Sequence, residues 1–175
     1  IEGTVNGNRV RGVSQNTPTG TPYNGWYMDL TWSAANGGAG PKGERVVSQA
    51  VVRADRVIFP TLIPSEDPCA AGGQSWLMEV ALYSGGRLDY SVFDINNDGV
   101  IDENDFINIG TADDPVLVPV SGLDPDIGII QKPTIIEDCI DGDECKIVSG
   151  SSGKAETIQE KGIQTGGRIN WEQLK

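Results

Sequence analysis

Short apolar segments separated by turn residues constrain the fold of this chain most strongly. Two strand-like segments, residues 45–52 and 56–63, flank a turn at Ala54, and a third follows at residues 75–82. Three short strands in succession predict an antiparallel meander. Because Pro60 has no backbone N–H to donate, we expect a bulge or an unpaired position where it lies in the second strand.

Further strands are expected on both sides of this meander. Residues 25–32 form an aromatic segment, which predicts a strand with its aromatic side chains in the core. Leu88, Tyr90 and Val92 alternate with polar residues, which predicts another strand. The closing residues 170–175 fit either a short helix or a last strand. The remaining strands are expected at residues 128–136, 146–149 and 154–159.

The order of meander, turn and meander favours an all-β fold that is part of a β-propeller, whose blades take about 40–50 residues each. A closed propeller needs about four blades, so 175 residues are too few for a complete ring. Residues 1–24 are expected to form a loop-rich lead-in. A partial propeller of antiparallel meander blades would follow over residues 25–175, with one acidic loop inserted.

That acidic loop, residues 94–105, has the spacing of an EF-hand-like calcium loop. Gly99 stands at the sixth position, where the chain must turn sharply. Ca²⁺ prefers about six to eight oxygen ligands, and the loop offers only oxygen. Because Asp105 is shorter than the usual final Glu, it would bind with one oxygen or reach less far. The predicted ligands are Asp94, Asn96, Asp98, the backbone carbonyl of Val100, Asp102 and Asp105.

Two readings of this loop stay open. Asp, Asn and Gly are also ordinary turn residues, so the same segment could be an acidic turn without a metal. If it does bind calcium, its context favours a structural clip. A strand leads into the loop, residues 103–109 allow only one or two helical turns, and no second loop pairs with it.

Charge and residue usage exclude several classes of protein. The chain has 13 Lys and Arg residues against 25 Asp and Glu residues, a net charge of −12, which argues against binding nucleic acid or anionic membranes. It has no His, the commonest general base and transition-metal ligand. No apolar run reaches the roughly 18–20 residues of a transmembrane helix.

Three cysteines bear on the compartment. Cys139 and Cys145 bracket a tight acidic turn, so we expect them to form a disulfide in an oxidising compartment. Three buried thiols are the alternative, and the partner of Cys69 stays open. The chain begins without an initiating Met or a signal peptide, which suggests a fragment of a larger, processed protein.

Several segments, in a specific order, resemble the C-terminal domain of the PilC/PilY-type proteins of type IV pili. These segments are residues 25–30, 43–47, 67–79, 119–122, 149–153 and 167–174. The resemblance covers most of the chain from Gly25 onward, whereas the first 24 residues match little. It implies the last blades of a C-terminal β-propeller, and it places a calcium site at Asp94, Asn96, Asp98, Val100 and Asp102.

The resemblance also implies a non-catalytic role at the pilus tip. Its expected partners are minor pilins of the tip complex and a host or abiotic surface. Its expected functions are pilus assembly, control of retraction, twitching motility and adhesion. The expected location is extracellular, at the pilus tip or cell surface, after transit through the periplasm and outer membrane.

Two other classes of protein use a similar calcium site. A dockerin-like docking module uses a similar calcium loop, but dockerins carry two loops in a small helical unit. A quinoprotein-like propeller dehydrogenase would also use calcium. The sequence has no His, no Gly-x-Ser-x-Gly nucleophile elbow and no cofactor fingerprint, so we do not expect an enzyme.

Overall fold

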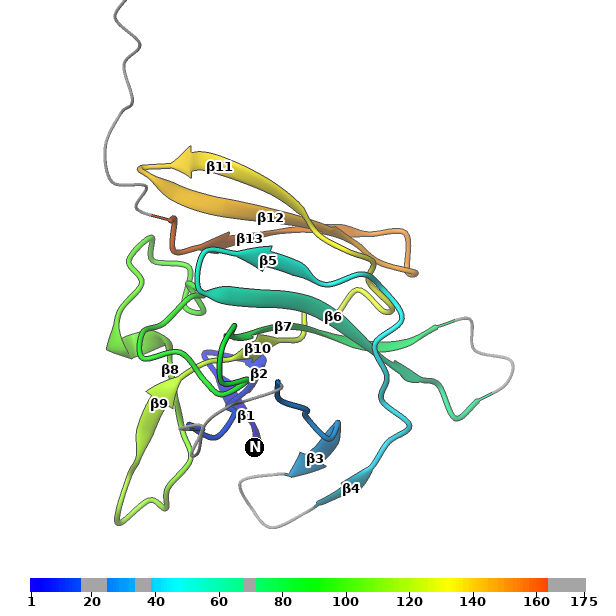
Figure 1. Cartoon of the computed structure of the whole chain (residues 1–175), viewed down its shortest axis with the longest axis horizontal. Helices are drawn as coiled ribbons and strands as arrows, with labels where there is room; N and C mark the ends of the chain where they lie inside the picture. The colour runs from blue at the N-terminus through cyan, green and yellow to red at the C-terminus, as the bar shows by residue number, and fades with distance from the viewer. Residues whose placement is uncertain (17–24, 34–38, 68–71, 164–175) are drawn as a thin grey trace, which may run out of the picture.

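A six-stranded antiparallel sheet runs through the centre of the molecule (Figure 1). The structure is a computed structural model that describes residues 1–16, 25–33, 39–67 and 72–163. The strands of this main sheet, in spatial order, are β1 (Glu2–Val5), β2 (Asn8–Arg11), β10 (Gly122–Leu123), β7 (Gly73–Ala81), β6 (Arg56–Pro64) and β5 (Val51–Arg53).

A second, three-stranded antiparallel sheet lies against the main one, above β5 and β6 in Figure 1. It contains β11 (Thr134–Ile140), β12 (Asp143–Ser149) and β13 (Ala155–Glu160). Two short pairs complete the described elements: β3 (Thr31–Ser33) with β4 (Ala39–Pro41), and β8 (Phe106–Asn108) with β9 (Leu117–Pro119). The 3₁₀ turn η1 (Glu103–Asp105) immediately precedes β8.

The larger apolar core lies between the two sheets. Ile58 and Leu77 of the main sheet pack in one cluster with Val148 and Ile158 of the smaller sheet. A second cluster, built around Trp76, covers the opposite face of the main sheet. Both faces of β6 and β7 are therefore buried, which explains why these strands read as nearly continuous apolar runs.

These sheets confirm the expected all-β fold with antiparallel pairing. The β5–β6–β7 meander is present, and β6, β7, β12 and β13 lie where strands were expected. Among the residues that the structure describes, no sheet closes into a ring, so the propeller stays a proposal. Two expected segments, residues 167–174 and 170–175, and the thiol of Cys69 lie outside the described residues.

The expected strand at residues 45–52 is shortened opposite Pro60. Arg45 and Leu62 exchange two backbone hydrogen bonds of 2.9 Å, and Val51 pairs with Ile58. The N–H of Leu62 points toward Arg45, so the nitrogen of Pro60, two residues earlier, faces the same side and has no proton to donate. Val51 lies six residues after Arg45, but their partners Ile58 and Leu62 are only four residues apart in β6. The residues between Arg45 and Val51 therefore leave the sheet.

Three other expectations about local structure were wrong. Residues 2–11, expected in a loop-rich lead-in, form β1 and β2 of the main sheet. Leu88 and Val92 are buried as their alternation suggested, yet their segment forms only an isolated bridge, between Phe93 and Glu160, in place of the expected strand. Only the last part of residues 128–136 is a strand, because β11 begins at Thr134.

The aromatic segment at residues 25–32 does not form the expected buried strand. Tyr27 is 87% exposed, and β3 begins only at Thr31. Trp26 lies across the surface turn that follows β7, where its indole Nε1 donates to the carbonyl of Leu82 at 2.8 Å. A Cβ on Gly85 would approach the Trp26 ring to 2.4 Å, so the glycine lets the indole pack directly on the backbone.

Candidate metal centre

The acidic loop at residues 94–105 is anchored to the core at both ends. At its start, Phe93 pairs with Glu160 in a β-bridge, and Ile95 is buried. The side chain of Asn8 in β2 donates to the carbonyl of Ile95 at 2.7 Å. At its end, Ile107 in β8 is buried against Gly3 and Gly12. Strand β13 and the β1–β2 hairpin therefore hold the ends of the loop.

The carboxylate of Asp94 organises the first half of the loop. It is 7% exposed, and its two oxygens accept from the backbone N–H of Asp98 at 3.3 Å and of Gly99 at 2.9 Å. Gly99 has a φ of 81°, a conformation that glycine adopts without steric cost. The loop therefore turns where the calcium spacing requires the turn.

Asn96 and Asp98 cap the same turn from outside. The side-chain oxygen of Asn96 accepts from the N–H of Asp98 at 3.0 Å, and Asp98 accepts from the N–H of Val100 at 2.8 Å. Bonds of this kind are Asx turns, in which a short polar side chain replaces a backbone partner. They leave the Asp98 side chain at the surface, where further ligands can reach it.

Asp105 closes the loop from inside the molecule and is fully buried. Its carboxylate accepts from the N–H of Ile95 at 2.7 Å and from the N–H of Asp102 at 3.0 Å. The Asp102 side chain in turn accepts from the N–H of Asn104 at 2.7 Å, which makes a capping box around η1. Asp105 thus joins the two ends of the loop.

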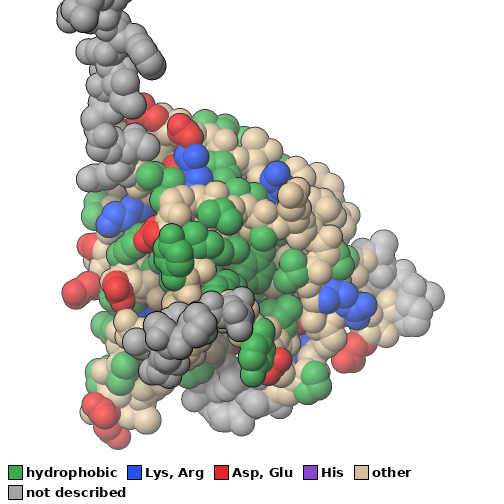
Figure 2. All heavy atoms as spheres, in the orientation of Figure 1, with side chains coloured by type: hydrophobic (Ala, Val, Ile, Leu, Met, Phe, Trp, Pro, Cys, Tyr) green, Lys and Arg blue, Asp and Glu red, His purple; other side chains and the backbone are tan. Residues whose placement is uncertain are grey.

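Burial raises the pKa of the Asp105 carboxyl above its ordinary value. Its backbone hydrogen bonds act in the opposite direction, and the nearby charge of Asp94 raises the pKa further. A cation bound at this point would remove part of that penalty. The space-filling view shows acidic side chains along the edge of the molecule beside η1 and β8 (Figure 2).

The donor chemistry of the loop fits calcium, since every predicted ligand offers oxygen and two carboxylates are buried at its base. Within the described ranges, however, no three Asp, Glu, Cys or His side chains converge as metal ligands would. Asp94 and Asp105 instead accept backbone hydrogen bonds. Val100 is 56% exposed and lies at the tip of the loop. Calcium binding therefore stays a proposal.

A cleft of about 310 Å³ adjoins the loop, a feature that the sequence did not suggest. Its wall includes Asp94, Arg9 and Asp124, and an ion pair of 2.5 Å joins the last two. Burial raises the pKa of Asp124, whereas the Arg9 charge lowers it. Arg9 and Asp124 are 115 positions apart in the chain, so no local pattern could reveal the cleft.

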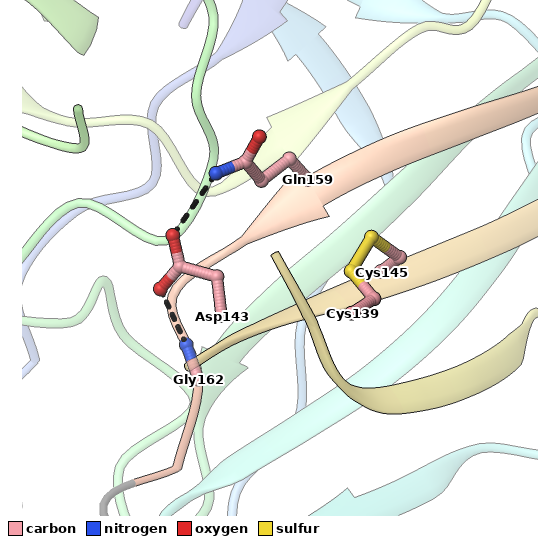
Figure 3. Close-up of a disulfide and its surroundings, with 5 residues drawn as sticks. All are labelled: Cys139, Asp143, Cys145, Gln159 and Gly162. Atoms are coloured by element: carbon pink, nitrogen blue, oxygen red, sulfur yellow. Dashed lines mark hydrogen bonds between the residues drawn. A yellow bond between two sulfur atoms is a disulfide. The ribbon is translucent and has the colours of Figure 1, made fainter. Parts of the chain in front are cut away.

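A disulfide joins Cys139 and Cys145 across the β11–β12 hairpin, with their Cα atoms 5.9 Å apart (Figure 3). The hairpin turns at Asp141 and Gly142, both with positive φ, as a two-residue hairpin loop requires. Asp143, just after the turn, accepts from the side chain of Gln159 at 3.1 Å and ties β12 to β13.

No family model matches this chain, whereas comparison with known proteins gives sequence relatives. The chain is 29% identical over 161 residues to type IV pilus biogenesis factor PilY1 of Pseudomonas aeruginosa, an alignment that covers 85% of this chain and 13% of that protein. It is 34% identical over 119 residues to a PilY1 homolog of Xylella fastidiosa, covering 65% of this chain and 9% of that protein.

A solved structure agrees with these relatives. The crystal structure of the P. aeruginosa PilY1 C-terminal domain superposes with a TM-score of 0.60 at 20% identity, over 91% of this chain and 29% of that one. This chain therefore spans only a small part of the proteins it matches. No helix in the described part of the chain is long and apolar enough to cross a membrane. The chain is thus related in sequence to type IV pilus biogenesis factor PilY1 and has the fold of part of the PilY1 C-terminal domain, which confirms the resemblance seen in its motifs.

Proposed function

We propose that this chain is a non-catalytic, calcium-binding module of a type IV pilus biogenesis protein. The observation that carries the proposal is the similarity to PilY1 over 85% of the chain. In this role the module acts outside the cell at the pilus tip, against minor pilins and the surface to which the pilus attaches. It supports assembly, control of retraction, twitching motility and adhesion. The β-propeller of the parent protein supplies the remaining blades.

Calcium would be held by the side chains of Asp94, Asn96, Asp98, Asp102 and Asp105 and by the carbonyl of Val100. The ion supplies positive charge among four carboxylates that repel one another without it. Asp94 and Asp105 are already fixed at the base of the loop, whereas Asp98 and Asp102 are exposed. Binding is expected to hold these exposed residues in one arrangement and to present a defined loop surface to a partner.

Calorimetric titration of Ca²⁺ into chelator-treated protein tests the metal site. We expect one saturable site that is lost in Asp98→Ala and retained in Asp113→Ala, since Asp113 is an exposed acid outside the loop. Limited proteolysis with and without Ca²⁺ tests the ordering of residues 94–105. Equal cleavage under both conditions would show that calcium does not order the loop.

The pilus role is tested separately, in the full-length parent protein. Cells that carry Asp98→Ala should assemble fewer surface pili and move less by twitching than cells that carry Asp113→Ala, at equal protein levels. Normal piliation and motility in a variant that has lost calcium binding would separate the metal site from the pilus function.

A further inference from the structure

Charged side chains are buried where the smaller sheet packs on the main sheet. Five of them are at most 2% exposed and come from four strands. We call them the inter-sheet cluster: Arg56 on β6, Glu79 on β7, Glu144 and Lys146 on β12, and Glu160 on β13. Charged groups are rarely buried this deeply, and the calcium loop makes no use of them.

Lys146 lies at the centre of the inter-sheet cluster between two carboxylates. Its Nζ is 2.5 Å from Oε1 of Glu79 and contacts Oε2 of Glu160. All three side chains are fully buried. Within the described chain, the Glu160 carboxylate has no hydrogen-bond partner of normal geometry. Lys146 is its one charged contact among the described residues, and Glu79 is the second acid at the same amine.

The other members of the inter-sheet cluster keep conventional ionic partners. Nη1 of Arg56 lies 3.2 Å from Oε2 of Glu79. Arg53 reaches in from the rim and contacts Glu144 at 2.8 Å. Glu79 is therefore shared between Arg56 and Lys146, whereas Glu160 has an ion-pair contact with Lys146 alone among the described residues.

Burial favours the uncharged form of the Lys146 amine. Loss of solvation lowers the pKa of Lys146, and the neighbouring charge of Arg56 lowers it further, although Glu79 acts in the opposite direction. A neutral amine beside a neutral carboxylic acid contains the same protons as the ion pair, so no outside acid or base is required. The neutral amine is a nucleophile, as the ammonium ion is not.

We propose that Lys146 and Glu160 become joined by an intramolecular isopeptide bond after the chain has folded. The lone pair of Nζ attacks Cδ of Glu160. Glu79 accepts a proton from the nitrogen and returns it to the departing hydroxyl group. One water leaves as the Nζ–Cδ amide bond forms, and no oxidant, reductant or further reactant takes part.

The contact between the two groups and the exclusion of water from the cluster favour this reaction. Two groups fixed in contact react as if at effective concentrations of up to about 10⁵–10⁸ M, and exclusion of water protects the product from hydrolysis. Glu79 belongs to β7, so the proton carrier arrives only when the two sheets pack. The bond would therefore form only in correctly folded chains.

The bond would complete a pattern in the smaller sheet. The Cys139–Cys145 disulfide already joins β11 to β12. An amide between Lys146 and Glu160 would join β12 to β13, so every strand of this sheet would be covalently linked to its neighbour. Neither the calcium site nor the pilus role is needed for this reaction, so its test stands apart from theirs.

Peptide mapping of the reduced, full-length protein with trypsin tests the proposal. Trypsin does not cleave after a lysine whose amine is an amide, so Lys146 should remain uncut. Residues 147–154 and 155–161 should be absent as free peptides and present in one linked species, lighter than the sum of its parts by one water molecule. Free residues 155–161 in high yield from folded wild-type protein would overturn the proposal.

Three variants test the roles of the amine and of the proton carrier, with one control. Lys146→Arg keeps the positive charge but cannot form this amide, and Glu79→Gln keeps the side-chain shape but removes the proton carrier. Both should release residues 155–161 as a free peptide. Glu156→Gln, an exposed change on the same strand, should map as linked. Complete linkage in Glu79→Gln would exclude Glu79 as the proton carrier. If either buried variant does not fold, the wild-type map alone still decides.

Discussion

The acidic loop at residues 94–105 and the inter-sheet cluster bury acidic side chains in two different ways. In the loop, Asp94 and Asp105 accept hydrogen bonds from backbone N–H groups within ten residues of themselves. In the cluster, Glu79 contacts charged side chains on β6 and β12, one of them 67 positions away. Backbone N–H groups can share a carboxylate with a cation, whereas a buried charged partner cannot be removed without leaving an isolated charge. The carboxylates of the loop are thus suited to binding a cation, whereas the contacts of the cluster are suited to holding the two sheets together.

The largest expected effect follows from removing Lys146. In Lys146→Met, the proposed amide to Glu160 cannot form and both Glu79 and Glu160 lose the amine that they contact. Removal of one partner of a buried pair typically costs about 3–5 kcal/mol of the free energy of unfolding. Urea denaturation measures the cost. Lys154→Met, an exposed change on the loop before β13, should leave the midpoint nearly unchanged. A small effect at Lys146 would mean that water reaches the cluster and that the contrast with the loop is false.

Removal of the disulfide should have the next largest effect. The Cys139→Ser/Cys145→Ser variant releases a short closed loop, and the expected loss of unfolding free energy is about 2 kcal/mol. Thermal unfolding of the oxidised protein, the reduced protein and the double variant measures it. Reduced wild type and the double variant should agree, because both free the β11–β12 hairpin alone.

A change at Asp94 should cost less stability but remove more function. In Asp94→Ala, the N–H groups of Asp98 and Gly99 lose their partner, but both residues are exposed and water can replace it, so the expected cost is about 1 kcal/mol. If calcium binds at the proposed site, the rise in melting temperature that Ca²⁺ causes in the wild type should disappear completely. Asp113→Ala serves as the matched control. Retained stabilisation by Ca²⁺ would show that the ion binds elsewhere.

The smallest effect is a pH dependence of the calcium-free protein. Because burial raises the pKa of Asp105 in the folded state, the folded protein binds this proton more tightly than the unfolded chain does. Its contribution to stability should therefore increase as the pH falls through the raised folded value toward the ordinary value of 3.8. Denaturation midpoints of wild type and Asp105→Asn across this pH range measure the effect. The increase in stability at lower pH should be present in the wild type and absent in the variant. A constant difference at every pH would mean that Asp105 does not titrate there.

Local patterns in the sequence were sufficient to predict elements whose partners are close in the chain. The β5–β6–β7 meander could be predicted because its strands follow one another across short connections. The anomaly at Pro60 could be anticipated because proline lacks a donor wherever it lies. The turn at Gly99 followed from the spacing of Asp, Asn and Gly, although that spacing does not decide whether the loop binds calcium.

Features that depend on distant contacts could not be predicted in this way. Lys146 and Glu160 look like the solvent-facing residues of alternating strands, and only the packing of the second sheet buries them. Tyr27 reads as a core residue, yet the turn near Gly85 leaves the aromatic segment at the surface. Strand β2 pairs with β10, more than a hundred residues later, and a two-residue strand leaves no pattern of its own.

The brevity of β10 also determines where the main sheet is mechanically weakest. Gly122 and Leu123 are the two strand positions that pair with both β2 and β7, and backbone bonds of Ser121 and Asp124 flank them. A Cβ on Gly122 would approach the sulfur of Met78 to 2.4 Å. The junction that β10 forms between β2 and β7 has few hydrogen bonds to resist a pulling force, whereas β6 and β7 pair along nine residues each. Under tension the sheet should separate at β10 first, so that the N-terminal hairpin peels away as a unit while β5, β6 and β7 stay together.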